Sequence, residues 1–174
     1  MAPHARIRFQ RLAAHHDRAG FTCGVGALDD FIRTKARKEN DLGYCSVFVM
    51  VDAESPSVID GYYSLSSHHI EVIGIAEDRR KRFPRYPHVP TILLGRLARS
   101  VTRRGAGVGE RILMDALKRS LQSAGNVGAH AVVVDAINEE AHRFYRKYGF
   151  ISIVDSNNRL YLPIETIRKL GLEV

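Results

Sequence analysis

The chain has 174 residues, of which 45% are hydrophobic and 26% are charged. These values are ordinary for a globular protein and allow a sizeable core, so we expect residues 1–174 to form a single domain. No apolar stretch approaches the length of a membrane-spanning helix, and the N-terminus lacks the apolar segment of a secretion signal. We therefore expect a cytoplasmic protein with no membrane partner.

The first half of the chain predicts one helix and three strands. The helical pattern contains Leu28, Phe31, Ile32 and Ala36 at helical spacing. The last two strands are rich in β-branched and aromatic residues and flank a turn at Pro56, so we expect an antiparallel hairpin. In chain order we expect a strand, a loop, a helix and the two hairpin strands over residues 7–12, 20–26, 27–40, 46–52 and 58–67.

The second half begins with a polar, basic surface excursion over residues 74–90, which contains three prolines. A buried strand is expected next, then a helix, an apolar strand and a short helix with Asn138 as its cap. Two short strands follow, and Pro163 is expected to start a last helix that ends near Gly171. After the excursion, the expected ranges are 91–99, 108–124, 129–136, 138–148, 151–154 and 160–162. This mixed order predicts an α/β sheet that is mostly antiparallel with one parallel step.

The thiols and imidazoles give no sign of a metal site. Cys23 and Cys45 lack metal-ligand spacing and a catalytic context, so we interpret them as reduced core or half-buried residues. The histidine pairs at residues 15–16 and 68–69 are expected on strands, where neighbouring side chains point to opposite sides. No metal ligand set is predicted from them.

The formal net charge is +7, and the basic residues cluster. Such a surface either only aids solubility or binds a polyanion, such as a phosphorylated cofactor, a nucleic acid or an acidic protein. We favour a polyanion, because the clusters flank a candidate phosphate site. They are an early helix (Arg33, Lys35, Arg37, Lys38), the run Arg79, Arg80, Lys81, Arg82 and Arg85, and the approach to a glycine-rich loop (Arg96, Arg99, Arg103, Arg104).

That candidate phosphate site is the sequence Arg-Gly-Ala-Gly-Val-Gly at residues 104–109. It lies between an apolar strand pattern and a helical pattern. Glycines allow a turn with exposed backbone N–H groups, and the start of the next helix adds unpaired N–H donors and a positive dipole end. Taken alone, the segment is also compatible with an ordinary strand-to-helix turn.

A second motif follows the glycine-rich loop by about thirty residues, and the two motifs together are more specific than the loop alone. The spacing Arg-x-x-Gly-x-Gly of Arg104, Gly107 and Gly109 is followed by Asn138, Ala141, Phe144, Tyr145, Gly149 and Phe150. In this order the two motifs resemble those of the GCN5-related N-acetyltransferase (GNAT) family. The resemblance covers most of the chain and implies a GNAT fold, in which two parallel central strands splay apart around acetyl-CoA.

A narrower resemblance is to the acetyltransferase toxins of type II toxin–antitoxin systems. It is carried by Phe21, Cys23, Gly24, Leu28, Asp29 and Phe31, then by the stretches 61–66, 94–98 and 127–129. It implies acetylation of the amino group of an aminoacyl-tRNA, a homodimer, and a partner antitoxin of the ribbon-helix-helix type. Two departures stand out. Arg99 and Ser100 replace the usual Val-Asp, and Arg104 replaces the usual Gln at the start of the loop. Arginine still suits a pyrophosphate.

The resemblance also implies roles for individual residues. Tyr145 is the candidate catalytic acid that protonates the departing thiolate. The expected contacts with acetyl-CoA come from Leu97, Ala98, Arg99, Arg104, Gly105, Ala106, Gly107, Val108, Gly109, Asn138, Ala141 and Phe144. The expected contacts with tRNA come from Arg33, Lys35, Arg79, Arg80, Lys81, Arg82 and Arg96. Because an α-amino group has a pKa of about 7.7–8.0, a strong general base is not required.

Alternatives stay open at this point. Tyr145 and Phe144 fit a helix core, Asn138 fits a helix cap alone, and Arg96 fits a structural role. The enzyme alternative is an acetyltransferase for a small amine or a protein lysine. The non-enzymatic alternative is a co-regulator that acts with an antitoxin on DNA.

Overall fold

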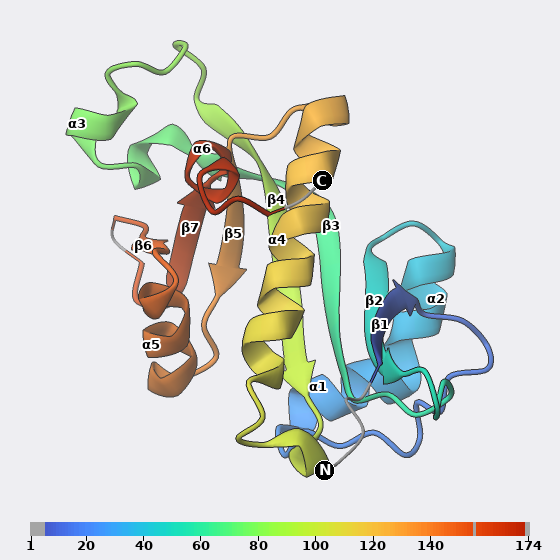
Figure 1. Ribbon diagram of the computed structural model, residues 1–174. Helices are drawn as coiled ribbons and strands as arrows, with labels where there is room; N and C mark the ends of the chain where they lie inside the picture. Colours follow the sequence, from blue (N-terminus) through green and yellow to red (C-terminus); the bar gives the residue numbers. More distant parts are fainter. Residues whose placement is uncertain (1–5, 155, 173–174) are drawn as a thin grey trace. The chain divides into compact units, whose positions relative to one another are not determined.

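A computed structural model describes residues 6–154 and 156–172. Its strands form one sheet in the order β1-β2-β3-β4-β5-β7-β6 (Figure 1). The strands are Ile7–Arg11 (β1), Ser46–Asp52 (β2), Gly61–Glu71 (β3), His88–Arg99 (β4), Ala131–Asp135 (β5), Ile151–Ser152 (β6) and Arg159–Pro163 (β7). The pairs β1–β2, β2–β3, β5–β7 and β6–β7 are antiparallel, and β4–β5 is parallel. The expected sheet with one parallel step is confirmed.

The helical elements occupy the connections. They are Gly26–Asp30 (α1), Phe31–Lys35 (η1, a π-helix), Ala36–Asp41 (α2), Val72–Gly74 (η2), Glu77–Arg80 (α3), Val101–Arg103 (η3), Val108–Val127 (α4), Glu139–Lys147 (α5) and Ile164–Arg168 (α6). Within the described part of the chain, every helix is too short or too polar to cross a bilayer. The packing divides the chain into two compact units, and β3, β4 and α4 contribute to both.

The first unit contains Met1–Ser66 and Gly95–Ala116. One face of its strands packs on the helical segment α1–η1–α2. There, buried Phe31, Ile32 and Ala36 meet alternate residues of β2, such as Val47 and Val49. On the other face the Tyr63 hydroxyl donates to the Asp115 carboxylate of α4. Neighbouring side chains of a strand point to opposite faces, so the strands of this unit contact α1–η1–α2 on one face and α4 on the other.

The early helix differs from the expectation of one regular helix over residues 27–40. The amide of Ala36 donates to the carbonyl of Phe31, an i→i+5 bond that makes η1 a π turn. Phe31, Ile32 and Ala36 are 2%, 0% and 0% exposed. The extra residue in this turn changes the helical register, and all three side chains face the core.

Two other predictions in this unit are wrong in detail. β3 runs from Gly61 to Glu71 instead of over residues 58–67, because Val58 forms an isolated bridge with Asp17 and the ladder with β2 begins at Gly61, opposite Met50. His15 and His16 lie in a turn and not on a strand, and the centroids of their rings are 4.0 Å apart. The His16 ring accepts a hydrogen bond from the amide of Ala13, which closes this turn.

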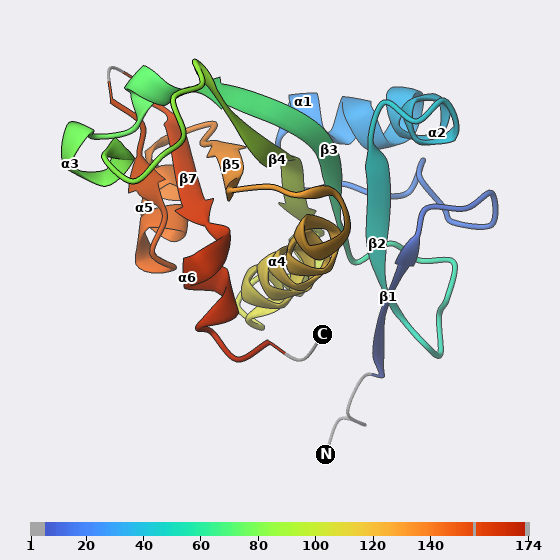
Figure 2. The same cartoon turned by 90° about the horizontal axis from the view of Figure 1, so that it is seen from above.

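The second unit contains Ser67–Leu94 and Leu117–Val174. Its β4–β5 pairing runs from Thr91 opposite Ala131 to Leu94 opposite Val134. A buried cluster that includes Val89, Val133 and Tyr161 forms its core. In Figure 2, α6 follows β7 directly, and the two elements contact each other.

The basic excursion is shorter than expected, because β4 already begins at His88, and α3 forms a helical turn within it. The strands β6 and β7 also differ from their expected bounds. β6 ends at Ser152, and β7 runs from Arg159 to Pro163. The last helix starts after Pro163, as predicted, but ends at Arg168.

Candidate functional site

The glycine-rich loop joins the end of β4 to the start of α4 within the first unit. Arg104 to Gly107 form an exposed turn, and Val108, which is buried, begins the helix. Gly105 has φ +76° and Gly107 has φ +67°, the left-handed region that other residues disfavour. A Cβ at either position would meet no atom within 4 Å, so the space beside both glycines is open. This open turn before a long helix has the form of an anion cradle.

Arg104, the candidate partner of a diphosphate, lies over another glycine. Its Nη2 is 3.2 Å from the position that a Cβ on Gly24 would occupy, and Gly24 has φ +86°. The loop that contains Gly24 is fixed by Asp29, whose carboxylate accepts hydrogen bonds from Thr22 Oγ1 at 3.0 Å and from the Cys23 amide at 2.8 Å. Two segments that the sequence analysis treated separately are therefore neighbours.

Asp29 and Cys23 illustrate the electrostatics of this loop. Burial raises the pKa of Asp29, but the hydrogen bonds from Cys23 and Thr22 outweigh it, and the net pKa lies below its usual value. Burial, with the neighbouring Asp29, raises the pKa of the Cys23 thiol to about 11. Both cysteines are free, Cys45 is buried and Cys23 is half-buried, as predicted.

Arg96 stacks on an aromatic ring in the first unit. Its guanidinium carbon lies 3.6 Å from the centroid of the Phe31 ring, and the side chain is half-buried. Contact at this distance is a cation–π interaction. The structural role that the sequence left open for Arg96 is thus present, through its contact with the Phe31 ring. Its contact with tRNA stays a prediction.

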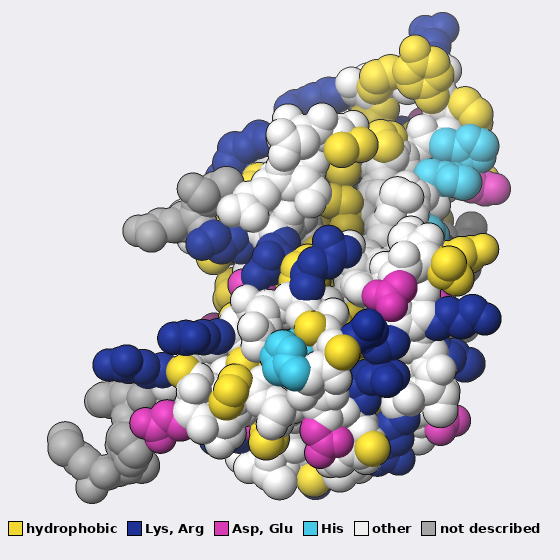
Figure 3. All heavy atoms as spheres, turned by 90° about the vertical axis from the view of Figure 1, so that its right-hand side faces the viewer, with side chains coloured by type: hydrophobic (Ala, Val, Ile, Leu, Met, Phe, Trp, Pro, Cys, Tyr) yellow, Lys and Arg dark blue, Asp and Glu magenta, His cyan; other side chains and the backbone are white. Residues whose placement is uncertain are grey.

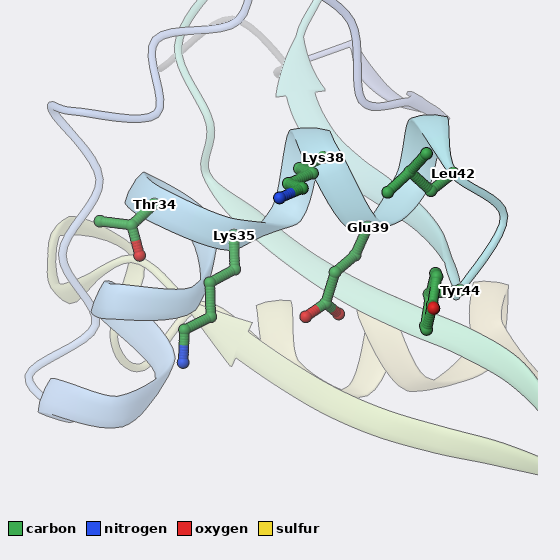
Figure 4. A pocket seen from close by; sticks show the side chains of 6 residues that line it. All are labelled: Thr34, Lys35, Lys38, Glu39, Leu42 and Tyr44. Atoms are coloured by element: carbon green, nitrogen blue, oxygen red, sulfur yellow. The ribbon is translucent and has the colours of Figure 1, made fainter.

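The other candidate tRNA residues of this unit lie on η1. Arg33 donates from Nε and Nη2 to the Phe21 carbonyl, at 3.1 and 2.6 Å. Lys35 is exposed and lines a shallow groove of about 550 Å³, which the sequence analysis missed (Figure 4). The groove is also lined by Thr34, Lys38, Glu39, Leu42 and Tyr44.

In the sequence, the two large apolar residues that follow the basic helix are the feature that could have indicated this groove. Leu42 is 62% exposed and Tyr44 is 74% exposed. The side chains of Lys35 and Glu39 extend to the same side of the helical segment (Figure 4). Basic side chains are also spread over the face of the molecule with β1, β2 and α2 (Figure 3).

In the second unit, α5 carries the residues of the second motif. Asn138 is the N-cap, and its Oδ1 accepts from the amide of Ala141 at 2.8 Å. The predicted cap is confirmed, and its expected contact with the pantetheine arm stays a prediction. The Tyr145 ring lies 5.3 Å from each of the rings of Phe144 and Phe150, centroid to centroid.

Tyr145 is 7% exposed, and burial raises the pKa of its phenol. The hydroxyl therefore keeps its proton at neutral pH, which is the state that a general acid requires. The packing of Tyr145 against Phe144 and Phe150 also agrees with the alternative that Tyr145 is a core residue. The role of Tyr145 in catalysis stays a prediction.

The second basic group and His68 also belong to this unit. Arg79 and Arg80 end α3, and Lys81 and Arg82 follow it; all but half-buried Arg80 are exposed. His68 Nδ1 lies 3.3 Å from Thr91 Oγ1, and burial lowers the pKa of this imidazole. His68 is therefore neutral at physiological pH.

The predicted residues are divided between the two units. The first unit holds Arg33, Lys35, Arg96, Leu97, Ala98, Arg99, Arg104, Gly105, Ala106, Gly107, Val108 and Gly109. The second unit holds Arg79, Arg80, Lys81, Arg82, Asn138, Ala141, Phe144 and Tyr145.

Comparison with known proteins gives the family. The chain is 32% identical to the probable toxin TacT of Sinorhizobium fredii over 162 residues, 89% of each chain. It is 31% identical to the tRNA-acetylating toxin of Mycobacterium tuberculosis over 141 residues, 81% of this chain and 82% of the relative. The chain belongs to the family of tRNA-acetylating toxins. No family model matches it.

Solved structures agree with this assignment. A crystal structure of KacT with a tyrosine-to-phenylalanine change matches with a TM-score of 0.88 and 30% identity, over 94% of this chain and 98% of KacT. AtaT complexed with acetyl-methionyl-tRNAfMet matches with a TM-score of 0.88 and 27% identity, over 94% and 98% of the two chains. AtaTR bound with AcCoA matches with a TM-score of 0.82 and 29% identity over 94% and 97%. Other complexes of AtaT contain the antitoxin AtaR, and AtaT–AtaR and KacTA have also been solved with DNA. The expected GNAT-type fold is confirmed.

Proposed function

We propose that this protein transfers the acetyl group of acetyl-CoA to the α-amino group of an aminoacyl-tRNA and thereby blocks translation. The observation that carries the proposal is the likeness of nearly the whole chain to AtaT in its complex with acetyl-methionyl-tRNAfMet. The relative with AcCoA supports the donor. Such a donor and acceptor place the reaction in the cytoplasm.

The glycine loop supplies the donor site in this proposal. The N–H groups of Gly105 to Gly109 and the guanidinium of Arg104 hold the diphosphate, since both offer hydrogen-bond donors to an anion. The backbone of Leu97 to Arg99 pairs with the amides of the pantetheine arm as an added strand would. Asn138, Ala141 and Phe144 contact the same arm. The open space beside Gly105 and Gly107 is what a close approach of phosphate oxygens needs.

Bound acetyl-CoA supplies an acyl thioester that the neutral amine of the aminoacyl-tRNA attacks at its carbonyl carbon. A new C–N bond forms and the C–S bond breaks. Tyr145 donates its phenolic proton to the departing sulfur, solvent takes the proton that the amine loses, and a proton from solvent restores the phenol of Tyr145. Since an α-amino group has a pKa of about 7.7–8.0, against about 10.4 for lysine, enough of it is neutral without a strong base.

The acceptor is tested by a competition among amines. The purified protein is incubated with acetyl-CoA labelled in its acetyl group, charged tRNA, a polyamine and a lysine-rich protein. Mass analysis then identifies the labelled product. We expect N-acetyl-aminoacyl-tRNA; label on the polyamine or on lysine with none on the tRNA would reject the proposed acceptor.

The basic residues supply the tRNA surface in the proposal. Alanine at Arg79, Arg80, Lys81 and Arg82 removes four charges from exposed or half-exposed positions. Each lost phosphate contact lowers the slope of log affinity against log salt by roughly 0.7–0.9. We expect weaker tRNA binding and a flatter salt dependence; an unchanged slope would remove this segment from the interface.

A partner antitoxin completes the proposed system, because AtaT has been solved with AtaR. We propose an antitoxin of the ribbon-helix-helix type that binds a homodimer of this chain. Light scattering with and without the antitoxin measures the assembly. A chain that stays monomeric at every concentration would contradict the dimer.

A second role on DNA is favoured by the solved complexes of KacTA and of AtaT–AtaR with DNA. In this role the antitoxin contacts operator DNA and the toxin modulates the affinity. A gel shift separates the two contributions. The chain alone should show only weak, sequence-independent binding, and specific binding without antitoxin would contradict this division.

A further inference from the structure

The segment that leads from β4 into the glycine loop is tied to two other parts of the first unit. The amide of Val101 donates to the carbonyl of Thr22 at 3.0 Å, and the amide of Ser100 donates to the carbonyl of Asp60 at 2.8 Å. Inside the segment, the amide of Arg103 donates to the carbonyl of Ser100 at 3.0 Å. The backbone just before the loop is therefore fixed by hydrogen bonds to residues far away in the sequence.

Asp60 accepts two hydrogen bonds from this segment. Besides its carbonyl, its carboxylate Oδ2 accepts a hydrogen bond from Arg103 Nη2 at 3.0 Å. The Asp60 side chain is only 6% exposed, whereas that of Arg103 is 38% exposed. A buried carboxylate needs a charged or hydrogen-bonded partner, and the hydrogen bond that Arg103 donates to the Asp60 carboxylate raises the pKa of the guanidinium.

Asp60 itself sits on a rigid base. Its amide donates to the carbonyl of Met50 in β2 at 2.8 Å, and β3 starts at the next residue, Gly61. A Cβ on Gly61 would lie 2.3 Å from Ile112 Cδ1 and 3.0 Å from the Ala98 carbonyl oxygen. The backbone of Gly61 thus packs closely on both α4 and β4, and the backbone of Asp60 is held by its hydrogen bonds to Met50 and Ser100.

Arg103 immediately precedes Arg104, the first residue of the glycine loop. Its charge is engaged by Asp60, so it does not act as a free ligand for an anion but fixes the direction in which the loop leaves η3. We propose that Asp60 is a positioning residue that acts through Arg103 to preorganise the loop 104–109 for a diphosphate. This inference rests on the proposed function, in which that loop binds the diphosphate of acetyl-CoA.

The test compares a ligand that has the diphosphate with one that lacks it. Calorimetry gives the Kd of CoA, and steady-state kinetics give kcat and KM for acetyl-CoA and for S-acetylpantetheine, which has the same thioester and arm. The variants are Asp60→Asn and Arg103→Gln, with Arg103→Lys as the conservative rescue. Asp41→Asn is the matched control, since it removes the same charge from an exposed ion pair of the first unit.

We expect the Kd of CoA and the KM of acetyl-CoA to rise about 10-fold or more in Asp60→Asn and Arg103→Gln, since a loosened loop must be ordered on binding. At saturation kcat should stay within about twofold, and kcat/KM for S-acetylpantetheine should not change. Arg103→Lys should recover part of the CoA affinity, and Asp41→Asn should match the wild type.

Three results would overturn the inference in distinguishable ways. Unchanged CoA affinity in Arg103→Gln, whose side chain is partly exposed and whose loss the fold tolerates better, would reject the positioning role even where Asp60→Asn fails to fold. Equal losses with acetyl-CoA and S-acetylpantetheine would make Asp60 a general structural residue. Absence of CoA binding by the wild type would reject the proposed function itself, and this inference with it.

Discussion

The left-handed glycines of the loop allow a test in which strain and ligand binding are separated. Gly105 has φ +76° and Gly43 has φ +77°, and a Cβ at either position meets no atom within 4 Å. Gly107 and Gly171 form a second matched pair, with φ +67° and +69° and the same open space. Alanine at any of the four positions therefore imposes the same backbone strain and no collision within the protein.

The size of the effect follows from this geometry. A left-handed conformation costs an L-residue about 1–2 kcal/mol, so each alanine variant should lose about this much free energy of unfolding. Where the empty loop relaxes to avoid this strain and must return to the left-handed form on binding, the cost appears in the CoA affinity of Gly105→Ala and Gly107→Ala instead of in their free energy of unfolding. It corresponds to a Kd about 5- to 30-fold higher. Gly43→Ala and Gly171→Ala should bind CoA as the wild type does.

Urea unfolding and calorimetry with CoA measure the two quantities on the same four proteins. A Kd increase beyond about 30-fold would mean that the new methyl group occupies space that the ligand needs. If Gly105→Ala and Gly107→Ala are destabilised less than their controls and still bind CoA within twofold of them, the loop does not bind the diphosphate in its left-handed form, and the assignment of residues 104–109 is refuted.

The remaining predictions concern the supports of the loop. Asp29→Ala should cost about 1.5–3 kcal/mol at pH 7, because it removes the acceptor of the Thr22 and Cys23 hydrogen bonds. Since the folded pKa of Asp29 lies below its unfolded value, its contribution is present above the unfolded pKa and lost as the pH falls through the folded pKa. Urea melts of wild type and variant should therefore converge in acid, and a constant difference would contradict this. With a pKa of about 11, Cys23 should react with iodoacetamide at pH 8 about 100-fold more slowly than free cysteine, as followed by mass spectrometry; a rate equal to that of glutathione would refute the assigned environment. Gly61→Ala should destabilise the protein by about 1–3 kcal/mol, since the methyl group would collide with Ile112; a thermal melt unchanged from wild type would contradict the close packing.

Features set by local sequence were predictable. The glycine loop before α4, the Asn138 cap of α5 and the β2–β3 hairpin each depend on residues within a few positions of one another. Local hydrogen bonds and backbone preferences decide such elements. The order of the two motifs then identified the family, which the relatives confirm.

Features set by distant packing were not predictable. The π turn at Phe31 exists because Ile32 and Ala36 must both reach the core against β2, a demand that the helical spacing of residues 27–40 does not show. The late start of β3 follows from the backbone bridge of Val58 with Asp17, which lies far away in the sequence. Neither carboxylate that supports the loop region, Asp29 or Asp60, belongs to the two motifs at 104–109 and 138–150.

The candidate tRNA residues show the same limit. Charge counts found Arg33 and Arg96, but their bonding depends on the fold. Arg33 binds the Phe21 carbonyl, and Arg96 covers the Phe31 ring. A cluster of basic residues in a sequence therefore predicts a partner of opposite charge, while the fold decides which of its members are free to reach that partner.

Acetyl transfer with a phenolic acid is tested most directly by one single-turnover measurement. Wild type and Tyr145→Phe are mixed with acetyl-CoA, labelled in its acetyl group, and aminoacyl-tRNA, and the label on the amino acid is followed with time. A phenolic acid at Tyr145 predicts that the variant transfers acetyl about 10²–10⁴-fold more slowly while it binds CoA as tightly as wild type. Transfer at the wild-type rate by Tyr145→Phe, or no labelled aminoacyl-tRNA from the wild type, would contradict the account.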